Sequence, residues 1–443
     1  MPHPVFIMTS LGPIFADDLA RVKPGDRLRL TISAQTSDAA ALAQAALEAR
    51  ARGERVLVVC ADPADVPRLA QEMPWFEPKL DVRPLPDWET LPYDVLSPQE
   101  ELVSERLEAL YRLTAPTGGA DVLLTSAVTA SQRLSPVSYI GANTFFFHQG
   151  EQISLTTLQK RLAAAGYANV KQVLAAGEFA VRGSIVDVFP MGSERPFRLD
   201  FFDDEIESIR WFDVDTQRSM ESAEEIRLLP GHEFPVDPEA LLAFRQRWRR
   251  EFAGDPKKSI VYCDIEKEIL PPGIEYYLPL FFDETAALTD YLPPNARVFL
   301  LGDIEVALQA FGRDMASRYK VLAADPQRPA LAPERIWLKP EEFFKSLANF
   351  ARFTVEKKEN AEDLKRLTGI EVDRKSQNPV GKLLERTRES AMKGVRTLIA
   401  APSAGRMETM SQLLRTGGLS VEEFPDWQTF LDADSSLGIA AAP

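Results

Sequence analysis

Cysteine and histidine are scarce in this sequence, with two cysteines and three histidines among 443 residues. Cys60 and Cys263 are 203 positions apart (263 − 60), and Cys60 ends a short apolar run that is typical of a buried strand. None of His3, His148 and His232 has a cysteine or histidine neighbour at metal-ligand spacing. We therefore expect no disulfide framework, no zinc site and no cofactor.

Long apolar runs and an excess of positive charge are also missing. No stretch approaches the roughly 20 apolar residues that a membrane-spanning helix needs, and residues 1–5 do not begin a signal peptide. These absences predict a cytoplasmic protein with no membrane partner. The formal net charge of −15 disfavours independent binding to nucleic acid, which requires clustered lysine and arginine. We interpret the arginines within residues 245–250 as a solvated helix face.

The first third of the chain predicts an α/β fold. Strand-like and helix-like segments alternate, and such alternation is typical of a doubly wound parallel sheet. The predicted strands are residues 28–32, 56–60, 81–85 and 121–126, and the predicted helices are residues 39–52, 63–73 and 97–113. Ser97 is expected to cap the last of these helices, with Pro98 at its first position and Glu100 completing a capping box.

A phosphate-binding loop is lacking at the first strand-to-helix junction. Such a loop needs glycines, which let the backbone curl around phosphates, and a lysine at the start of the helix. The segment from Ser33 to Ala39 contains neither, and Asp38 places a negative charge where a phosphate would lie. We therefore predict that this sheet binds no nucleotide. The sequence also contains no nucleophile motif that we recognise, so no catalytic residue is predicted.

Two arginines lie in a strand-rich segment that follows a predicted helix at residues 154–166. Residues 177–190 and 197–207 alternate apolar and polar positions, and residues 190–196 are rich in turn formers, so we expect a hairpin. Arg182 and Arg198 should then lie on neighbouring strands with carboxylates nearby. From the pattern alone the arginines are either a platform for recognising a protein surface or ordinary solvated ion pairs.

The rest of the chain gives weaker signals. Helices are predicted at residues 238–252, 304–320 and 378–392, and a strand at residues 397–402 is followed by a helix from Ser403. Residues 270–282 form an irregular run of prolines and aromatics, and residues 323–333 are typical of a linker. Because the sequence stops shortly after a strand-like run, we expect it to be part of a longer protein.

Four motifs carry a resemblance to a known family. They are residues 85–94 (LPDWETLPYD) with Ser97 and Pro98, residues 182–193 (RGSIVDVFPMGS), residues 198–206 (RLDFFDDEI) and residues 270–276 (LPPGIEY). In order and spacing they resemble the N-terminal region of the bacterial transcription-repair coupling factors. The resemblance covers about residues 25–300, and the family's RNA-polymerase-binding domain and helicase-type motor are not part of the sequence.

The resemblance implies a particular architecture. Residues 1–130 and 216–335 would form the two parts of a degenerate domain like that of the damage-verification protein UvrB, which is related to nucleoside triphosphatases. Residues 131–215 would be an inserted α+β domain that docks UvrA. Residues 336–443 would be a small α/β domain, which is truncated at its C-terminal end.

The resemblance also implies a site and a function. The UvrA-docking surface would centre on Arg182, Arg198 and Asp200, with Lys171 or Arg195 in compensating positions. Phe179 would be either an interface anchor or a core residue. Ala168 and Ala180 stand where related sequences often have arginines.

The expected function is that of an adaptor for DNA repair. It would recruit UvrA, and so nucleotide excision repair, to RNA polymerase stalled at DNA damage. RNA polymerase and double-stranded DNA would be bound by the missing C-terminal half, which would hold the ATP-dependent translocase. The alternatives are a UvrB-like ATP-dependent enzyme that processes damaged DNA and, with no supporting motif, a small-molecule α/β enzyme.

Overall fold

The computed structural model describes residue 19 and residues 21–33, 37–115, 119–358 and 380–443. The chain divides into two compact units. The first unit contains residues 1–83, 294–302 and 350–443, and the second contains residues 84–293 and 303–349. Among the described residues, no helix is long and apolar enough to cross a membrane.

The first unit is built on parallel strands. Four of them lie in the order β1–β14–β13–β2, so strands from widely separated parts of the chain are neighbours. The strands β2 and β13 are buried along their whole length, as expected for the centre of a parallel sheet. The elements are β1 (Arg27–Ser33), α2 (Ser37–Ala51), β2 (Val56–Cys60), α3 (Asp65–Phe76), β13 (Arg297–Leu301) and β14 (Ala351–Lys358), while β3 (Val82–Pro84) lies at the junction of the units.

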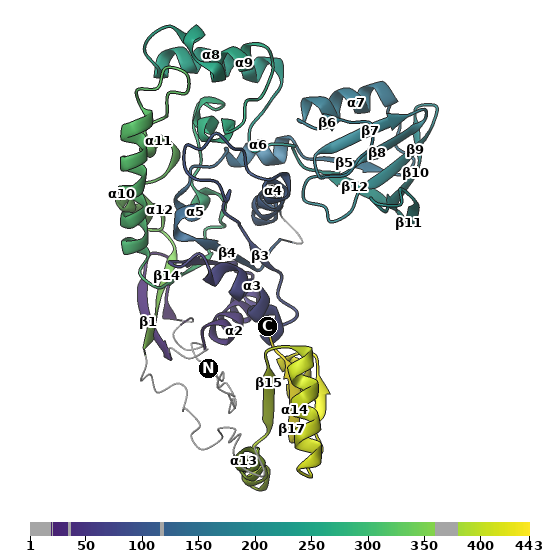
Figure 1. Cartoon of the computed structure of the whole chain (residues 1–443), viewed down its shortest axis with the longest axis vertical. Helices are drawn as coiled ribbons and strands as arrows, with labels where there is room; N and C mark the ends of the chain where they lie inside the picture. The colour runs from purple at the N-terminus through teal and green to yellow at the C-terminus, as the bar shows by residue number, and fades with distance from the viewer. Residues whose placement is uncertain (1–18, 20, 34–36, 116–118, 359–379) are drawn as a thin grey trace. The chain divides into compact units, whose positions relative to one another are not determined.

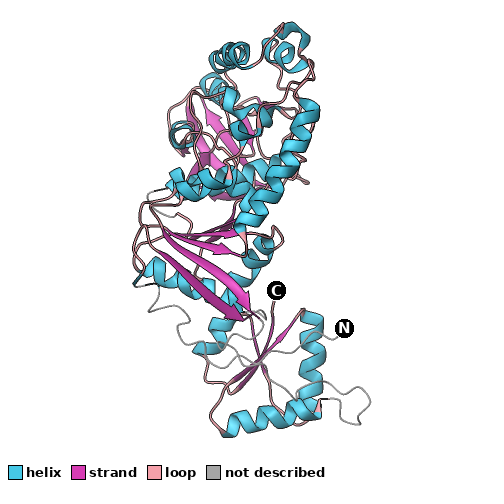
Figure 2. Ribbon diagram, turned by 90° about the vertical axis from the view of Figure 1, so that its left-hand side faces the viewer, coloured by secondary structure: helices cyan, strands magenta, loops and turns pink. Residues whose placement is uncertain are grey.

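A small second sheet completes the first unit. Its three strands are parallel and lie in the order β15–β17–β16. Figure 2 shows them as magenta arrows beside cyan helices. The elements are α13 (Gly381–Met392), β15 (Thr397–Ala401), α14 (Ala404–Thr416), β16 (Glu422–Phe424), α15 (Trp427–Asp432) and β17 (Leu437–Ala441). The predicted start of α13 at residue 378 lies outside the described residues.

The second unit contains an aromatic core and a separate β-rich module. The core gathers side chains from α8 (Pro238–Glu251), α9 (Ile260–Glu266), the irregular run 270–282, α10 (Ile304–Leu322) and α11 (Pro333–Ile336). Its elements are α4 (Glu100–Thr114), β4 (Val122–Ser126), α5 (Ala127–Ser131), α6 (Val137–Ala142), α8 (Pro238–Glu251), η1 (Pro256–Lys258), α9 (Ile260–Glu266), η2 (Ile274–Leu280), η3 (Leu288–Tyr291), α10 (Ile304–Leu322), α11 (Pro333–Ile336) and α12 (Pro340–Ser346).

The β-rich module consists of a six-stranded sheet, a two-stranded sheet and one helix (Figure 1). The larger sheet has the order β11–β10–β9–β8–β7–β6, and the smaller pairs β12 with β5. The elements are β5 (Phe145–His148), α7 (Leu155–Ala164), β6 (Ala168–Asn169), β7 (Glu178–Arg182), β8 (Ile185–Val188), β9 (Phe197–Phe202), β10 (Glu205–Phe212), β11 (Ser219–Ala223) and β12 (Glu225–Leu228).

These observations confirm the mixed α/β class with parallel sheets and several domains, but the module extends past residue 215. The backbone N–H of Asp213 donates to the carbonyl oxygen of Arg218 at 3.0 Å, so this segment is a turn that returns the chain as β11. At the other expected boundary, β14 pairs with β1 and β13, so residues 351–358 belong to the first sheet.

Two local predictions differ from the structure. Helix α4 begins at Glu100, because Ser97 makes bonds elsewhere: its Oγ donates to Glu275 at 2.8 Å and accepts from the N–H of Gly273 at 3.0 Å. Residues 323–333 are not a free linker. The hydroxyl of Tyr93 donates to the carbonyl oxygen of Leu331 at 2.9 Å, and the Leu331 side chain is buried.

Candidate protein-docking site

The six-stranded sheet has one apolar face and one charged face. Along β9, Phe197, Leu199 and Phe201 are buried, whereas Arg198 and Asp200 alternate with them and are partly accessible. Because successive side chains of a strand point to opposite faces, the two polar residues share the face turned away from the apolar core. The predicted hairpin between β8 and β9 is confirmed by their antiparallel pairing.

Arg182 and Arg198 lie two strands apart, which corrects the expectation of neighbouring strands. The run 177–190 contains a tight turn at Gly183 and Ser184, because Arg182 pairs directly with Ile185. Gly183 adopts a φ of 65°, a conformation that glycine tolerates without strain. The run therefore forms both β7 and β8, and β8 separates the two arginines.

Asp187 on β8 holds both arginines. Its side chain is 0% exposed, and it lies directly opposite Arg198 in the register of β8 and β9. Nε and Nη2 of Arg198 donate to Oδ1 and Oδ2 of Asp187 at 2.7 and 3.0 Å, and Arg182 also donates to Oδ2. Buried carboxylates of this kind need such partners, because an unpaired buried charge is strongly unfavourable.

The two arginines differ in how tightly they are held. The side chain of Arg198 is 15% exposed, lies over the ring of Phe212 at 5.0 Å, and also donates to the carbonyl oxygen of Gln217 at 3.2 Å. Its hydrogen bonds to Asp187 raise the pKa of the Arg198 guanidinium above its ordinary value. The side chain of Arg182 is 48% exposed. Arg182 is therefore the more available of the two for a partner's carboxylate.

The charged face contains one further arginine. Arg210 on β10 lies directly opposite Arg198 and is exposed, and directly opposed residues point to the same face. Asp200 is also on this face, where it accepts a hydrogen bond from the hydroxyl of Ser208 at 3.1 Å. Sequence reasoning missed Asp187 and Arg210, because only the register of the strands brings them into one row. We call Arg182, Asp187, Arg198, Asp200 and Arg210 the charged face.

The other predicted site residues lie around this face or behind it. Phe179 is buried in the apolar core. Because side chains alternate along β7, Arg182 lies on the opposite face of the sheet. Ala180 is buried in a small cluster with Val173 and Phe212. Lys171 is exposed in the loop that contributes Val173 to this cluster. Two of the predicted positions do not lie on the strands that carry the charged face. Ala168 is exposed on the edge strand β6, and Arg195 is exposed in the turn between β8 and β9.

The predicted degenerate loop from Ser33 to Ala39 falls partly outside the described residues, since residues 34–36 are not among them. Asp38 is described, and it lies buried in the first turn of α2. Nη2 of Arg68 donates to Oδ2 of Asp38 at 2.6 Å. Burial lowers the pKa of Arg68, but its hydrogen bonds to Asp38 and Asp65 outweigh this and raise it overall. The N-terminal end of a helix attracts anions, and in α2 the carboxylate of Asp38 already lies there.

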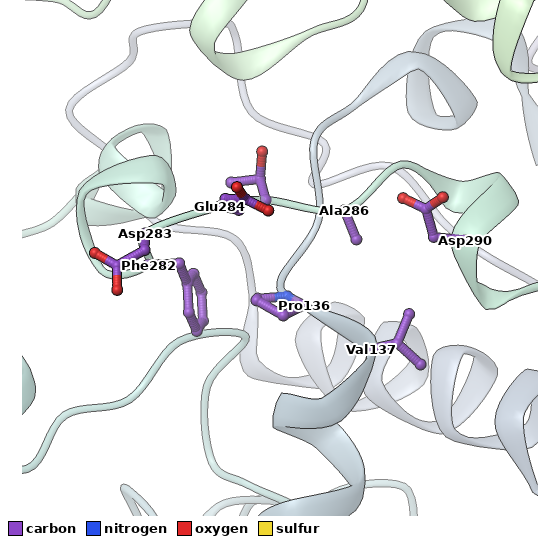
Figure 3. Close-up of a pocket in the computed structure, with 8 residues that line it drawn as sticks. Pro136, Val137, Phe282, Asp283, Glu284, Ala286 and Asp290 are labelled. Atoms are coloured by element: carbon purple, nitrogen blue, oxygen red, sulfur yellow. The ribbon is translucent and has the colours of Figure 1, made fainter.

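A shallow pocket of about 540 Å³ lies elsewhere in the second unit (Figure 3). It is lined by residues 136–137 and 282–286 and by Asp290. Two of its three carboxylates already serve the fold: Asp283 accepts from Nη2 of Arg247 at 2.6 Å, and Asp290 accepts from the N–H of Ala287 at 2.8 Å. No group of three or more potential metal-binding side chains occurs within the described part of the chain.

Family models match two parts of the chain. The UvrB interaction domain model matches residues 145–234, which include the whole β-rich module and its charged face. The model described as MFD, D3 domain matches residues 391–443, which include the small parallel sheet. The sheet with its charged face therefore lies in the part of the chain that is similar to the UvrB interaction domain.

Curated relatives are similar to this chain over most of its length. The chain is 42% identical to the transcription-repair-coupling factor of Escherichia coli strain K12 over 298 residues, which are 67% of this chain and 26% of that protein. It is 40% identical to the Haemophilus influenzae protein of the same name over 344 residues, 75% of this chain and 29% of that protein. The resemblance to the N-terminal region of the transcription-repair coupling factors is thereby confirmed, and the chain spans less than a third of these relatives.

Proposed function

We propose that this chain is the adaptor part of a transcription-repair coupling factor, and that its charged face docks UvrA. The observation that carries the proposal is the pair of arginines held by buried Asp187 on the sheet that the UvrB interaction domain model matches. A guanidinium fixed by a buried carboxylate is positioned before binding, so less conformational entropy is lost when a partner's carboxylate meets it.

The parts of such a factor beyond this chain would supply the other activities. RNA polymerase and double-stranded DNA would be bound there, and the ATP-dependent motor would lie there. This part would carry no catalysis, would need no cofactor, and would act in the cytoplasm. Binding through the charged face would bring excision repair to a stalled polymerase. The acidic balance of the chain supports a protein partner over independent nucleic-acid binding.

The proposal is tested by calorimetry of this chain with purified UvrA at moderate salt. The informative variant is Arg182→Ala, because Asp187 keeps its two bonds from Arg198 and remains paired. Truncating a desolvated charged contact costs about 2–5 kcal/mol, so binding should weaken about 30-fold or more. Arg161→Ala, which removes an exposed arginine from α7, is the matched control.

Binding by the unmodified chain that Arg182→Ala weakens and Arg161→Ala preserves would support the proposal. An unmodified chain that does not bind UvrA, or equal affinities for the two variants, would overturn it. The UvrB-like ATP-dependent alternative makes a different prediction, namely that the chain binds ATP. We expect no ATP binding by calorimetry, because Asp38 and Arg68 already fill the N-terminal end of α2.

A further inference from the structure

Arg352 is an almost fully buried arginine in the sheet of the first unit. It lies on β14, between β1 and β13, and is 5% exposed. Its Nε has no hydrogen-bond partner within the described part of the chain. Burial lowers the pKa of the Arg352 guanidinium, the positive charge of Arg27 lowers it further, and no carboxylate of a described residue raises it. Because a buried charge without a partner is strongly unfavourable, the isolated chain carries an uncompensated cost at this position.

The register of the sheet places a second arginine directly beside Arg352. Its partner on β1 is Arg27, and the two strands lie side by side (Figure 1). Side chains that are paired across neighbouring strands point to the same face of a sheet, and like charges in such positions repel each other. Arg27 is exposed, so the pair combines a buried guanidinium with an accessible one at the edge strand of the sheet.

The groups beside Arg352 do not neutralise it. Its partner on β13 is Val298, which is apolar and 0% exposed. The carbonyl oxygen of Asp26 accepts from the backbone N–H of Arg352 at 3.0 Å, but Oδ2 of Asp26 accepts from the backbone N–H of Lys23 at 2.9 Å. The nearest acidic residue in the sequence of β1 is therefore engaged in its own turn.

The next arginine along the same face is treated differently by the fold. Arg29 follows Arg27 by two residues on β1, and its Nη1 lies 3.2 Å from Oε1 of Glu356 on β14. One arginine of this row is thus neutralised within the sheet. The pair formed by Arg27 and Arg352 has no such partner among the described residues, which leaves it suited to an anion from outside the chain.

We propose that Arg27 and Arg352 bind a phosphate group at the β1 edge of the first sheet. The planar guanidinium donates two parallel N–H bonds to an oxyanion, and phosphate is among the groups that it recognises best. A phosphate dianion has the charge and the oxygens to serve two guanidiniums, whereas a carboxylate neutralises only one. The site belongs to the first unit and the charged face to the second, so this inference does not depend on UvrA docking.

The first experiment titrates the unmodified chain with inorganic phosphate, glycerol 3-phosphate and acetate by calorimetry, at about pH 8 and constant ionic strength. Phosphate is doubly charged at this pH. We expect saturable phosphate binding, with acetate at least about 10-fold weaker because it carries half the charge. Binding of glycerol 3-phosphate as tight as that of inorganic phosphate would identify the ligand as a phosphate group of a larger molecule, and binding of inorganic phosphate alone would identify it as the free ion.

Variants of exposed residues locate the site. Arg27→Ala should weaken phosphate binding about 10-fold or more, because it removes charged hydrogen bonds to the ligand. The matched control combines Arg29→Gln with Glu356→Gln, which removes the neighbouring ion pair on the same face and leaves the net charge unchanged. This control should bind phosphate as the unmodified chain does. Equal affinities for Arg27→Ala and the control would overturn the proposal, as would acetate that binds as tightly as phosphate or a chain that binds neither phosphate compound.

Arg352→Met gives a readout that distinguishes a ligand-binding arginine from a structural one. Methionine fills similar space without a charge, so without phosphate the amides of β1 and β14 should exchange more slowly in this variant than in the unmodified chain. Phosphate at about ten times its dissociation constant should slow their exchange about 11-fold in the unmodified chain and leave it unchanged in Arg352→Met. Faster exchange in Arg352→Met without phosphate, or a phosphate effect that persists in it, would overturn the proposal.

Discussion

Replacing Asp187 by asparagine should destabilise the β-rich module more than any other single polar change on its sheet. Asp187 is fully buried, and both of its oxygens accept bonds from guanidinium groups. Asparagine keeps the shape but removes the charge, and its amide turns an N–H donor toward other donors. Arg198, which is mostly buried, then keeps a positive charge without its carboxylate.

The size of the effect follows from burial. Removing one partner of a buried ion pair costs about 3–5 kcal/mol, and we take the lower value because Arg182 is half exposed and is easily resolvated. A loss of about 3 kcal/mol corresponds to an increase of about 150-fold in the population of the open module. Global thermal unfolding is a poor readout, because a chain of several domains does not unfold in a single two-state step.

Native-state hydrogen exchange is the better assay, because it reports the opening of individual elements. The amides of β8 and β9 should exchange about 150-fold faster in Asp187→Asn, while those of β2 and β13 in the first unit should not change. Asp200→Asn is the control, since Asp200 accepts a single hydroxyl hydrogen bond and should cost less than about 1 kcal/mol. Equal exchange in the two variants would refute the argument that Asp187 holds the sheet together.

Three further predictions concern groups outside the charged face. Burial raises the pKa of Glu275 to about 7 from 4.5, so the native state binds the extra proton and stability should fall as the pH rises from about 4.5 to 7, by about 3 kcal/mol. Glu275→Gln should abolish this loss in native-state hydrogen exchange of the second unit at several pH values, corrected for the intrinsic exchange rate, and an unchanged profile would contradict it. Burial lowers the pKa of His232 to about 4 from 6.5, so stability should fall in the opposite direction, as the pH drops from about 6.5 to 4. His232→Phe should remove that acid sensitivity, measured in the same exchange experiments, and a variant as acid-sensitive as the unmodified chain would refute the assignment. Arg68→Ala should destabilise the first unit by about 2–3 kcal/mol, measured by native-state hydrogen exchange of α2 and α3, because buried Asp38 loses its guanidinium, and a change below about 0.5 kcal/mol would show that the pair contributes little.

The sequence predicted elements whose signals are local. The helix at residues 154–166 was readable because Leu158 and Leu162 recur at helical spacing, and both are buried in α7. The strands β8 and β9 were readable because apolar and polar residues alternate along them. In each case the periodicity of a few consecutive residues decides the outcome, and distant parts of the chain only reinforce it.

Other features depend on contacts between distant residues. Ser97 has the sequence context of a helix cap, but bonds to Gly273 and Glu275, about 180 positions away, use its hydroxyl instead. Strand β14 follows the predicted linker, yet its partners are β1 and β13. Gly183 lies between two segments of alternating residues, which is a local sequence signal for a tight turn that divides the run into two strands.

The predicted docking residues have unequal roles, and this inequality affects how variants are interpreted. A list based on resemblance treats Phe179, Arg182 and Arg198 alike. In the structure Phe179 belongs to the core, and Arg198 neutralises a buried carboxylate, so changes at either residue disturb the sheet itself. Lost binding in an Arg198 variant therefore does not establish contact with a partner. Arg182 is half exposed, and Asp187 stays paired with Arg198 without it, so binding experiments on Arg182 report more directly on the proposed interface.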